Sequence, residues 1–69
     1  MRFKENEVVR LKRSLILPGE ESDEQSTFLS KGTKGTVVFV WEDSNTYLIE
    51  FKKEELELSL PESFLDKIN

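Results

Sequence analysis

The chain has 69 residues, a net charge of −4, and neither cysteine nor histidine. A domain of this size buries only about 60% of the surface that its unfolded chain exposes, so a full core leaves no room for a deep cleft. Without histidine and cysteine, the sequence lacks the commonest general base, the commonest metal ligand and any disulfide. We therefore expect one domain, residues 1–69, that is not an enzyme and holds neither a metal nor another cofactor.

The sequence also predicts a cytoplasmic protein. No apolar run approaches the roughly 18 residues that a membrane span requires. The N-terminal residues are charged, and no long apolar segment of a signal peptide follows them.

The first predicted strand covers residues 7–13. Val9 and Leu11 alternate with Arg10 and Lys12, which gives one buried and one basic face.

A long exposed loop is predicted next, over residues 18–30. Pro18 and Gly19 favour a turn, and residues 20–27 contain no apolar side chain. Phe28 and Leu29 are expected to pin the far end of this loop to the core.

Two glycines three residues apart predict a tight turn at residues 31–35, because glycine permits positive φ or a close backbone approach. Residues 36–41 are β-branched or aromatic throughout and predict the central strand, buried on much of both faces. Strict alternation would place Trp41 on the same face as Val37 and Phe39.

The C-terminal half predicts a hairpin and a short closing segment. Residues 42–45 form its connection, and residues 46–52 and 55–60 alternate as strands. One helical turn is expected at residues 61–65, with a last short strand over residues 65–68. The fold class predicted is therefore all-β, a small closed barrel of four to five antiparallel strands with a long early acidic loop.

Three segments together resemble SH3-like barrels: Val9-Arg10-Leu11, Lys31 to Val38, and Tyr47 to Phe51. The pattern is similar to short uncharacterised bacterial single-domain proteins, which fit best and imply no reaction. It also resembles KOW-type ribosomal and transcription-factor domains, the barrel of the nitrile hydratase β subunit, and the variable chain of ferredoxin–thioredoxin reductase. The resemblance implies a barrel fold, while function depends on the site.

The candidate partner-binding residues are an acidic run and two aromatic residues: Glu20, Glu21, Asp23, Glu24, Trp41 and Tyr47. The run suits a basic partner or mimics nucleic-acid phosphates, and its simpler interpretation is a solvated loop. Trp41 and Tyr47 are expected to be cross-strand neighbours. They form either a structural brace, which we favour, or half of a binding groove.

A second candidate set is basic: Arg10, Lys12, Arg13, Lys31 and Lys34. If these side chains converge, they form a phosphate-binding patch. The simpler interpretation is a solvated face that pairs with Glu55 and Glu57. The negative net charge disfavours nucleic acid as a partner.

The sequence thus favours a non-catalytic protein-interaction module, for example an inhibitor or immunity-type factor. The alternatives are a KOW-like nucleic-acid-binding domain and a small accessory subunit of a larger enzyme. The expected partner is another protein, without membrane contact.

Overall fold

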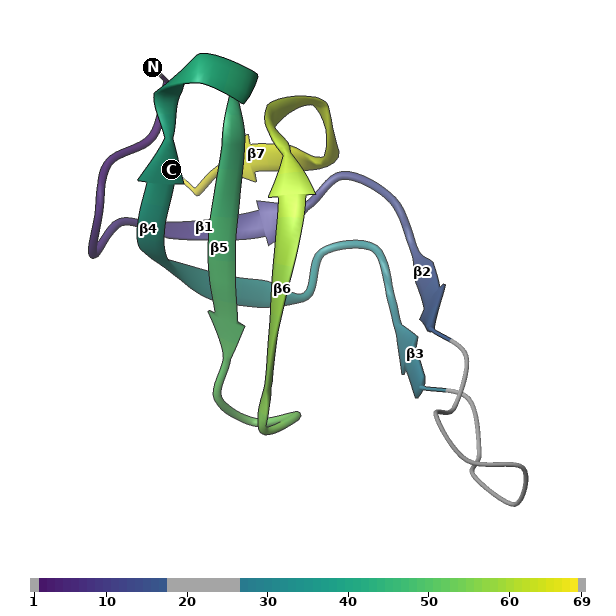
Figure 1. Ribbon diagram of the computed structural model, residues 1–69. Helices are drawn as coiled ribbons and strands as arrows, with labels where there is room; N and C mark the ends of the chain where they lie inside the picture. The colour runs from purple at the N-terminus through teal and green to yellow at the C-terminus, as the bar shows by residue number, and fades with distance from the viewer. Residues whose placement is uncertain (1, 18–26, 69) are drawn as a thin grey trace.

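The computed structural model describes residues 2–17 and 27–68, and within them the chain is all-β. Five strands form one sheet in the order β6-β5-β4-β1-β7, and two more form a separate hairpin (Figure 1). All pairings are antiparallel. The strands are β1 (Val8–Leu11), β2 (Leu15–Leu17), β3 (Thr27–Leu29), β4 (Lys34–Trp41), β5 (Thr46–Phe51), β6 (Leu56–Pro61) and β7 (Leu65–Lys67).

Strand β4 belongs to both halves of the sheet. Its first residues pair with β1, where Lys34 lies opposite Arg10, and its remainder pairs with β5, up to Trp41 opposite Thr46. Between the two halves β4 bends, so that β1 and β7 cross β5 and β6 at a steep angle (Figure 1). A break in register falls between Val37 and Phe39.

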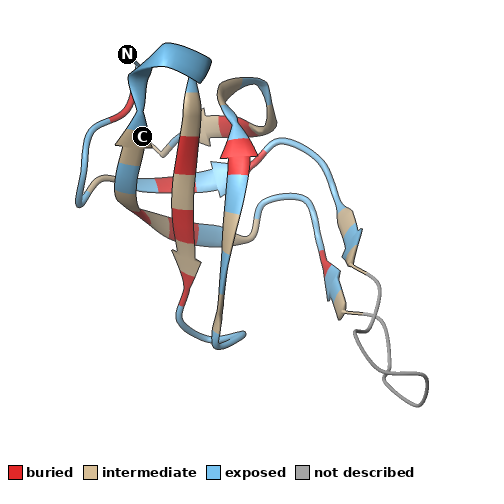
Figure 2. Cartoon of the chain, viewed as in Figure 1, coloured by how far each residue is buried: buried red, intermediate tan, exposed pale blue. Residues whose placement is uncertain are grey.

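The core lies between these crossed layers. Strand β5 supplies three of its side chains by strict alternation, as predicted: Tyr47, Ile49 and Phe51 (Figure 2). The other buried hydrophobic residues are Phe3, Val9, Leu11, Leu29, Val37, Leu60 and Leu65. The alternating leucines of β6 face the same core.

The predicted glycine turn is confirmed, and its two glycines serve different purposes. Gly32 has a φ of 91°, a backbone conformation that residues with a Cβ rarely adopt. Gly35 has an ordinary backbone but no space, since a Cβ there would lie 2.5 Å from Ile49 Cγ2 and 3.0 Å from Phe51 Cε1. Its missing side chain lets β4 bend closely over β5.

The predicted loop over residues 18–30 is wrong at its far end, and residues 18–26 lie outside the described part of the chain. Thr27–Leu29 forms β3 and pairs with β2. Leu29 is buried, as expected, but Phe28 is 61% exposed. Phe28 lies opposite Ile16, and this pair occupies the outward face of the hairpin.

The C-terminal predictions are confirmed. A 3-10 turn, η2, covers Glu62–Phe64 between β6 and β7, and a second turn, η1, covers Glu42–Ser44 between β4 and β5. The strand number was predicted too low, because the early hairpin adds β2 and β3. The described strands form a sheet whose order ends at β6 and β7, and they show no closed barrel.

Candidate functional site

Nine side chains of β4, β5 and β6 form a surface that we call the outer face, directed away from the core. Residues opposite each other in the sheet place their side chains on one side of it. The register therefore defines three rows: Trp41–Thr46–Pro61, Phe39–Leu48–Ser59 and Thr36–Glu50–Glu57. All nine are exposed or half-buried, whereas the alternate positions of β5 are buried.

Phe39 lies on the opposite side of β4 from the one that the sequence predicts, whereas Trp41, for which the sequence leaves both a core and an exposed position open, is exposed. Strict alternation would have placed Phe39 and Trp41 with the buried Val37, but the irregularity between Val37 and Phe39 shifts the pairing by one residue. Phe39 is consequently 45% exposed and Trp41 is 40% exposed. The prediction that the central strand is buried on both faces is therefore wrong for its second half.

Phe39 and Trp41 contact each other edge to face. Their ring centroids are 5.0 Å apart and their planes are inclined by 67°. Leu48 lies opposite Phe39 and extends the apolar area onto β5. Exposed aromatic side chains on a rigid sheet are the type of residue that dominates protein interfaces.

Tyr47 is a structural brace and is not part of the outer face. It lies opposite Val40, not Trp41, so the predicted cross-strand pair is wrong. Its ring is fully buried edge-on against Phe3, at 5.3 Å between centroids. Its hydroxyl donates a hydrogen bond of 2.6 Å to Glu62 Oε2 and accepts one of 3.4 Å from the Phe3 N–H.

This buried hydroxyl changes two pKa values. Burial, together with the hydrogen bond to Glu62, raises the pKa of Tyr47 above its ordinary value of 10.0. The same hydrogen bond, aided by the Arg2 N–H, lowers the pKa of Glu62 below its ordinary value of 4.5. Both groups therefore retain their ordinary charge at neutral pH.

The third row of the outer face carries two carboxylates. Glu50 and Glu57 are direct partners in the β5–β6 register. The described residues form two ion pairs, Arg2–Asp66 and Arg10–Asp66, and neither involves this row. Like charges directly opposite each other in a sheet destabilise it.

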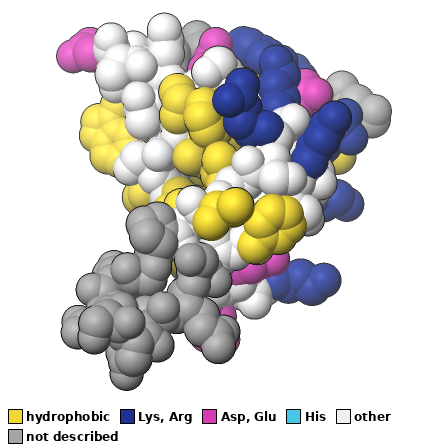
Figure 3. All heavy atoms as spheres, turned by 90° about the vertical axis from the view of Figure 1, so that its right-hand side faces the viewer, with side chains coloured by type: hydrophobic (Ala, Val, Ile, Leu, Met, Phe, Trp, Pro, Cys, Tyr) yellow, Lys and Arg dark blue, Asp and Glu magenta, His cyan; other side chains and the backbone are white. Residues whose placement is uncertain are grey.

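The basic candidates partly converge. Arg10, Lys12 and Lys31 line one hollow, together with Asp66. Lys34 lies opposite Arg10 in the β1–β4 register. On the side of the molecule shown in Figure 3, basic side chains gather beside a band of hydrophobic ones.

Two expectations about the basic set are not met. Arg13 does not line this hollow; its guanidinium stacks on the Phe64 ring, 4.7 Å from the centroid. Arg10 pairs with Asp66 at 3.7 Å, so the expected pairing with Glu55 and Glu57 is wrong for this residue.

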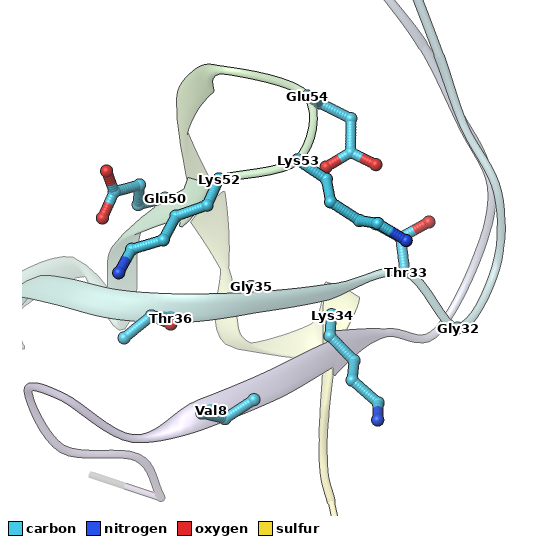
Figure 4. Close-up of a pocket in the computed structure, with 10 residues that line it drawn as sticks. All are labelled: Val8, Gly32, Thr33, Lys34, Gly35, Thr36, Glu50, Lys52, Lys53 and Glu54. Atoms are coloured by element: carbon cyan, nitrogen blue, oxygen red, sulfur yellow. The ribbon is translucent and has the colours of Figure 1, made fainter.

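A further hollow lies between the glycine turn and the β5–β6 turn (Figure 4). Its charged side chains have both signs: Lys34, Lys52, Lys53, Glu50 and Glu54. Lys53 extends towards Thr33, whereas Lys34 points away from the β5–β6 turn (Figure 4). Taken as a whole, this hollow favours neither an anion nor a cation, and Glu50 belongs to the outer face as well.

The predicted acidic site residues Glu20, Glu21, Asp23 and Glu24 lie outside the described residues. Among residues 2–17 and 27–68, no cluster of acidic side chains is suited to hold a metal ion. The same part of the chain has no helix of the length and apolarity needed to cross a membrane. No family model, curated protein or solved structure matches the chain significantly.

The sequence thus predicted Trp41 as a candidate but missed the surface around it. Phe39, Leu48, Glu50 and Glu57 were not proposed as site residues. The alternation of residues 46–52 did place Leu48 and Glu50 on the face opposite Tyr47, which was the available signal.

Proposed function

We propose that the chain is a non-catalytic protein-interaction module that binds its partner through the outer face. The observation that carries this proposal is the exposed Phe39–Trp41 pair. Scattered exposed apolar residues are normal, but two contacting aromatic rings beside a half-buried leucine form a contiguous patch. Burying such rings against a partner releases apolar surface from water, which is the dominant favourable term in association.

We further propose that the fold is of the SH3-like type. In support, the strand order is β6-β5-β4-β1-β7, and β4 is shared between two crossed layers. A hairpin separates β1 from β4, and a 3-10 turn separates β6 from β7. This arrangement agrees with the resemblance of the glycine turn and its flanking strands to that class.

The outer face favours a protein over a nucleic acid as its partner. Its only charged side chains, Glu50 and Glu57, would repel a phosphate backbone. An inhibitor or immunity-type factor is one form of such a module, and an accessory subunit of an enzyme is another. Identification of the partner separates these two forms.

Site-specific photo-crosslinking in a lysate of the native host tests the proposal. A photo-crosslinking phenylalanine derivative replaces Ser59, an exposed position in the middle row of the outer face. The matched control carries the same group in place of Lys12, which lines the basic hollow. We expect a protein adduct from position 59 that survives nuclease and disappears when Trp41→Ala is added.

Adducts from position 12 alone, or adducts lost on nuclease treatment, would contradict this function and favour the second candidate. That candidate is nucleic-acid binding through Arg10, Lys12 and Lys31, supported by their convergence on one hollow. It predicts an affinity for single-stranded RNA that falls steeply with salt and weakens in a Lys12→Gln, Lys31→Gln variant. Fluorescence anisotropy with labelled RNA at two salt concentrations measures both effects.

A further inference from the structure

We propose that the outer face binds an extended partner segment that carries a basic side chain and, at two-residue intervals from it, apolar side chains. This inference rests on the proposed function and adds the chemistry of the partner. It combines the two features of the outer face, an apolar aromatic area and a negatively charged row beside it.

The charged row lacks a cation of its own. Glu50 and Glu57 lie directly opposite each other, and neither forms an ion pair with a described residue. No cation among the described residues neutralises their like charges, which destabilise a sheet when they lie directly opposite each other. An arginine or lysine placed between them would remove the repulsion and gain two charge-assisted contacts, so charge complementarity selects a basic segment.

Lys52 is an internal cation that could compete for this role. It lines the same two hollows as Glu50, but no ion pair joins them. In Figure 4 the Lys52 side chain extends past Glu50 without meeting its carboxylate. A Lys52→Gln variant should therefore bind a basic segment more tightly, because a repelling charge is removed.

The spacing of the rows sets the pattern of the segment. Glu50, Leu48 and Thr46 mark the three rows along β5, two residues apart. Successive side chains on one face of an extended chain are separated by about 6.6 Å, so a segment aligned with β5 has the same period. A basic residue over the carboxylate row then places its second neighbour over Leu48 and Phe39 and its fourth over Trp41.

The apolar and the charged side chains of the outer face occupy different rows. Trp41 lies in the row farthest from the carboxylates and Phe39 lies in the middle row, so apolar and charged contacts do not compete for one place. A segment with an acidic residue over the carboxylate row would bring three like charges together. The surface therefore discriminates by repulsion as well as by attraction.

Titration of the full chain with three blocked peptides tests the inference. The first has the order threonine, arginine, threonine, leucine, threonine, leucine, threonine; the second has glutamine and the third glutamate in place of arginine. Amide chemical shifts measure binding and its location, and Trp41, the only tryptophan, provides a fluorescence signal. We expect the arginine peptide to shift β4, β5 and β6 amides and to bind about fivefold to tenfold more tightly than the glutamine peptide.

Variants assign the preference to the carboxylates. In Glu50→Gln, Glu57→Gln the two peptides should bind with equal affinity, whereas Trp41→Ala should weaken both by the same factor. Glu5→Gln removes an exposed charge that is not part of the outer face; it is the matched control and should change neither affinity. Amide spectra of each variant establish that it is folded.

The outcomes separate this inference from the proposed function. Equal binding of the arginine and glutamine peptides to the unaltered chain, or shifts confined to β1 and β7, would overturn the basic segment. The absence of binding by all three peptides would overturn it as well. None of these results removes a protein adduct at position 59, which tests the interaction module by itself.

Discussion

Replacing Gly35 with alanine is the sharpest test of how β4 is held against β5. The added Cβ would lie 2.5 Å from Ile49 Cγ2, and 3.0 and 3.1 Å from two carbons of Phe51. Ordinary contacts between carbon atoms are about 3.5–4.0 Å. Both neighbours are fully buried and cannot move towards solvent.

The expected cost follows from this crowding. Overpacking a core by a methyl group costs about 1–3 kcal/mol, which exceeds the gain of about 0.4–1 kcal/mol from restricting the unfolded chain. A domain of this length has a total stability of about 3.5–10 kcal/mol. The net cost is then at most about 2.6 kcal/mol. We therefore expect Gly35→Ala to lower the melting temperature by up to about 20 °C.

Thermal and urea unfolding of three variants measures this effect. Ile49→Ala alone should cost about 2–5 kcal/mol, because it leaves a cavity. In the double variant with Gly35→Ala, the new methyl group takes the place of the removed Cγ2. The loss of unfolding free energy in the double variant should therefore be smaller than the sum of the two single losses by at least about 0.5 kcal/mol. A Gly35→Ala protein that melts at or above the unaltered temperature would refute the close approach.

Three further predictions concern the outer face and the tyrosine brace. Phe39→Ala should cost about 1 kcal/mol in urea unfolding, well below Ile49→Ala, because the residue is already 45% exposed. Equal costs would mean that Phe39 is part of the core. Glu57→Gln should raise stability by about 0.2–1 kcal/mol at low salt, and this gain should shrink at 1 M salt; a loss of stability would mean that its carboxylate has a partner. The lowered pKa of Glu62 predicts that this carboxylate stabilises the fold above pH 4.5 and that its contribution is lost as pH falls. The raised pKa of Tyr47 predicts that its neutral hydroxyl stabilises the fold below pH 10.0 and that this contribution is lost as pH rises. Tyr47→Phe should flatten both limbs of the measured pH profile, and an unchanged acid limb would contradict the role of the hydrogen bond.

Regular alternation made much of the fold predictable. The period of two in residues 46–52 identified both faces of β5, and the glycines at 32 and 35 marked the turn before β4. Proline at position 61 and the apolar residues after it indicated the helical turn. These signals are local, because each reflects the conformation of the residues that carry it.

The outer face could not be predicted in the same way. Its aromatic pair depends on the irregularity between Val37 and Phe39, and a run of β-branched and aromatic residues gives no sign of where its pairing will shift. The opposition of Glu50 and Glu57 depends on the register of two strands. That register is set by the whole hairpin and by the burial of its alternate side chains.

The sharing of β4 between two layers makes the domain behave as one thermodynamic unit. Because β4 pairs with strands of both layers, we expect a ligand on the outer face to stabilise β1 and β7 as well, although it does not touch them. Binding of a ligand to the folded state alone raises the free energy of unfolding in proportion to the logarithm of ligand concentration. Amide hydrogen exchange in β1 would therefore slow when a segment binds on the far side of the bend, and the melting temperature would report occupancy of any face.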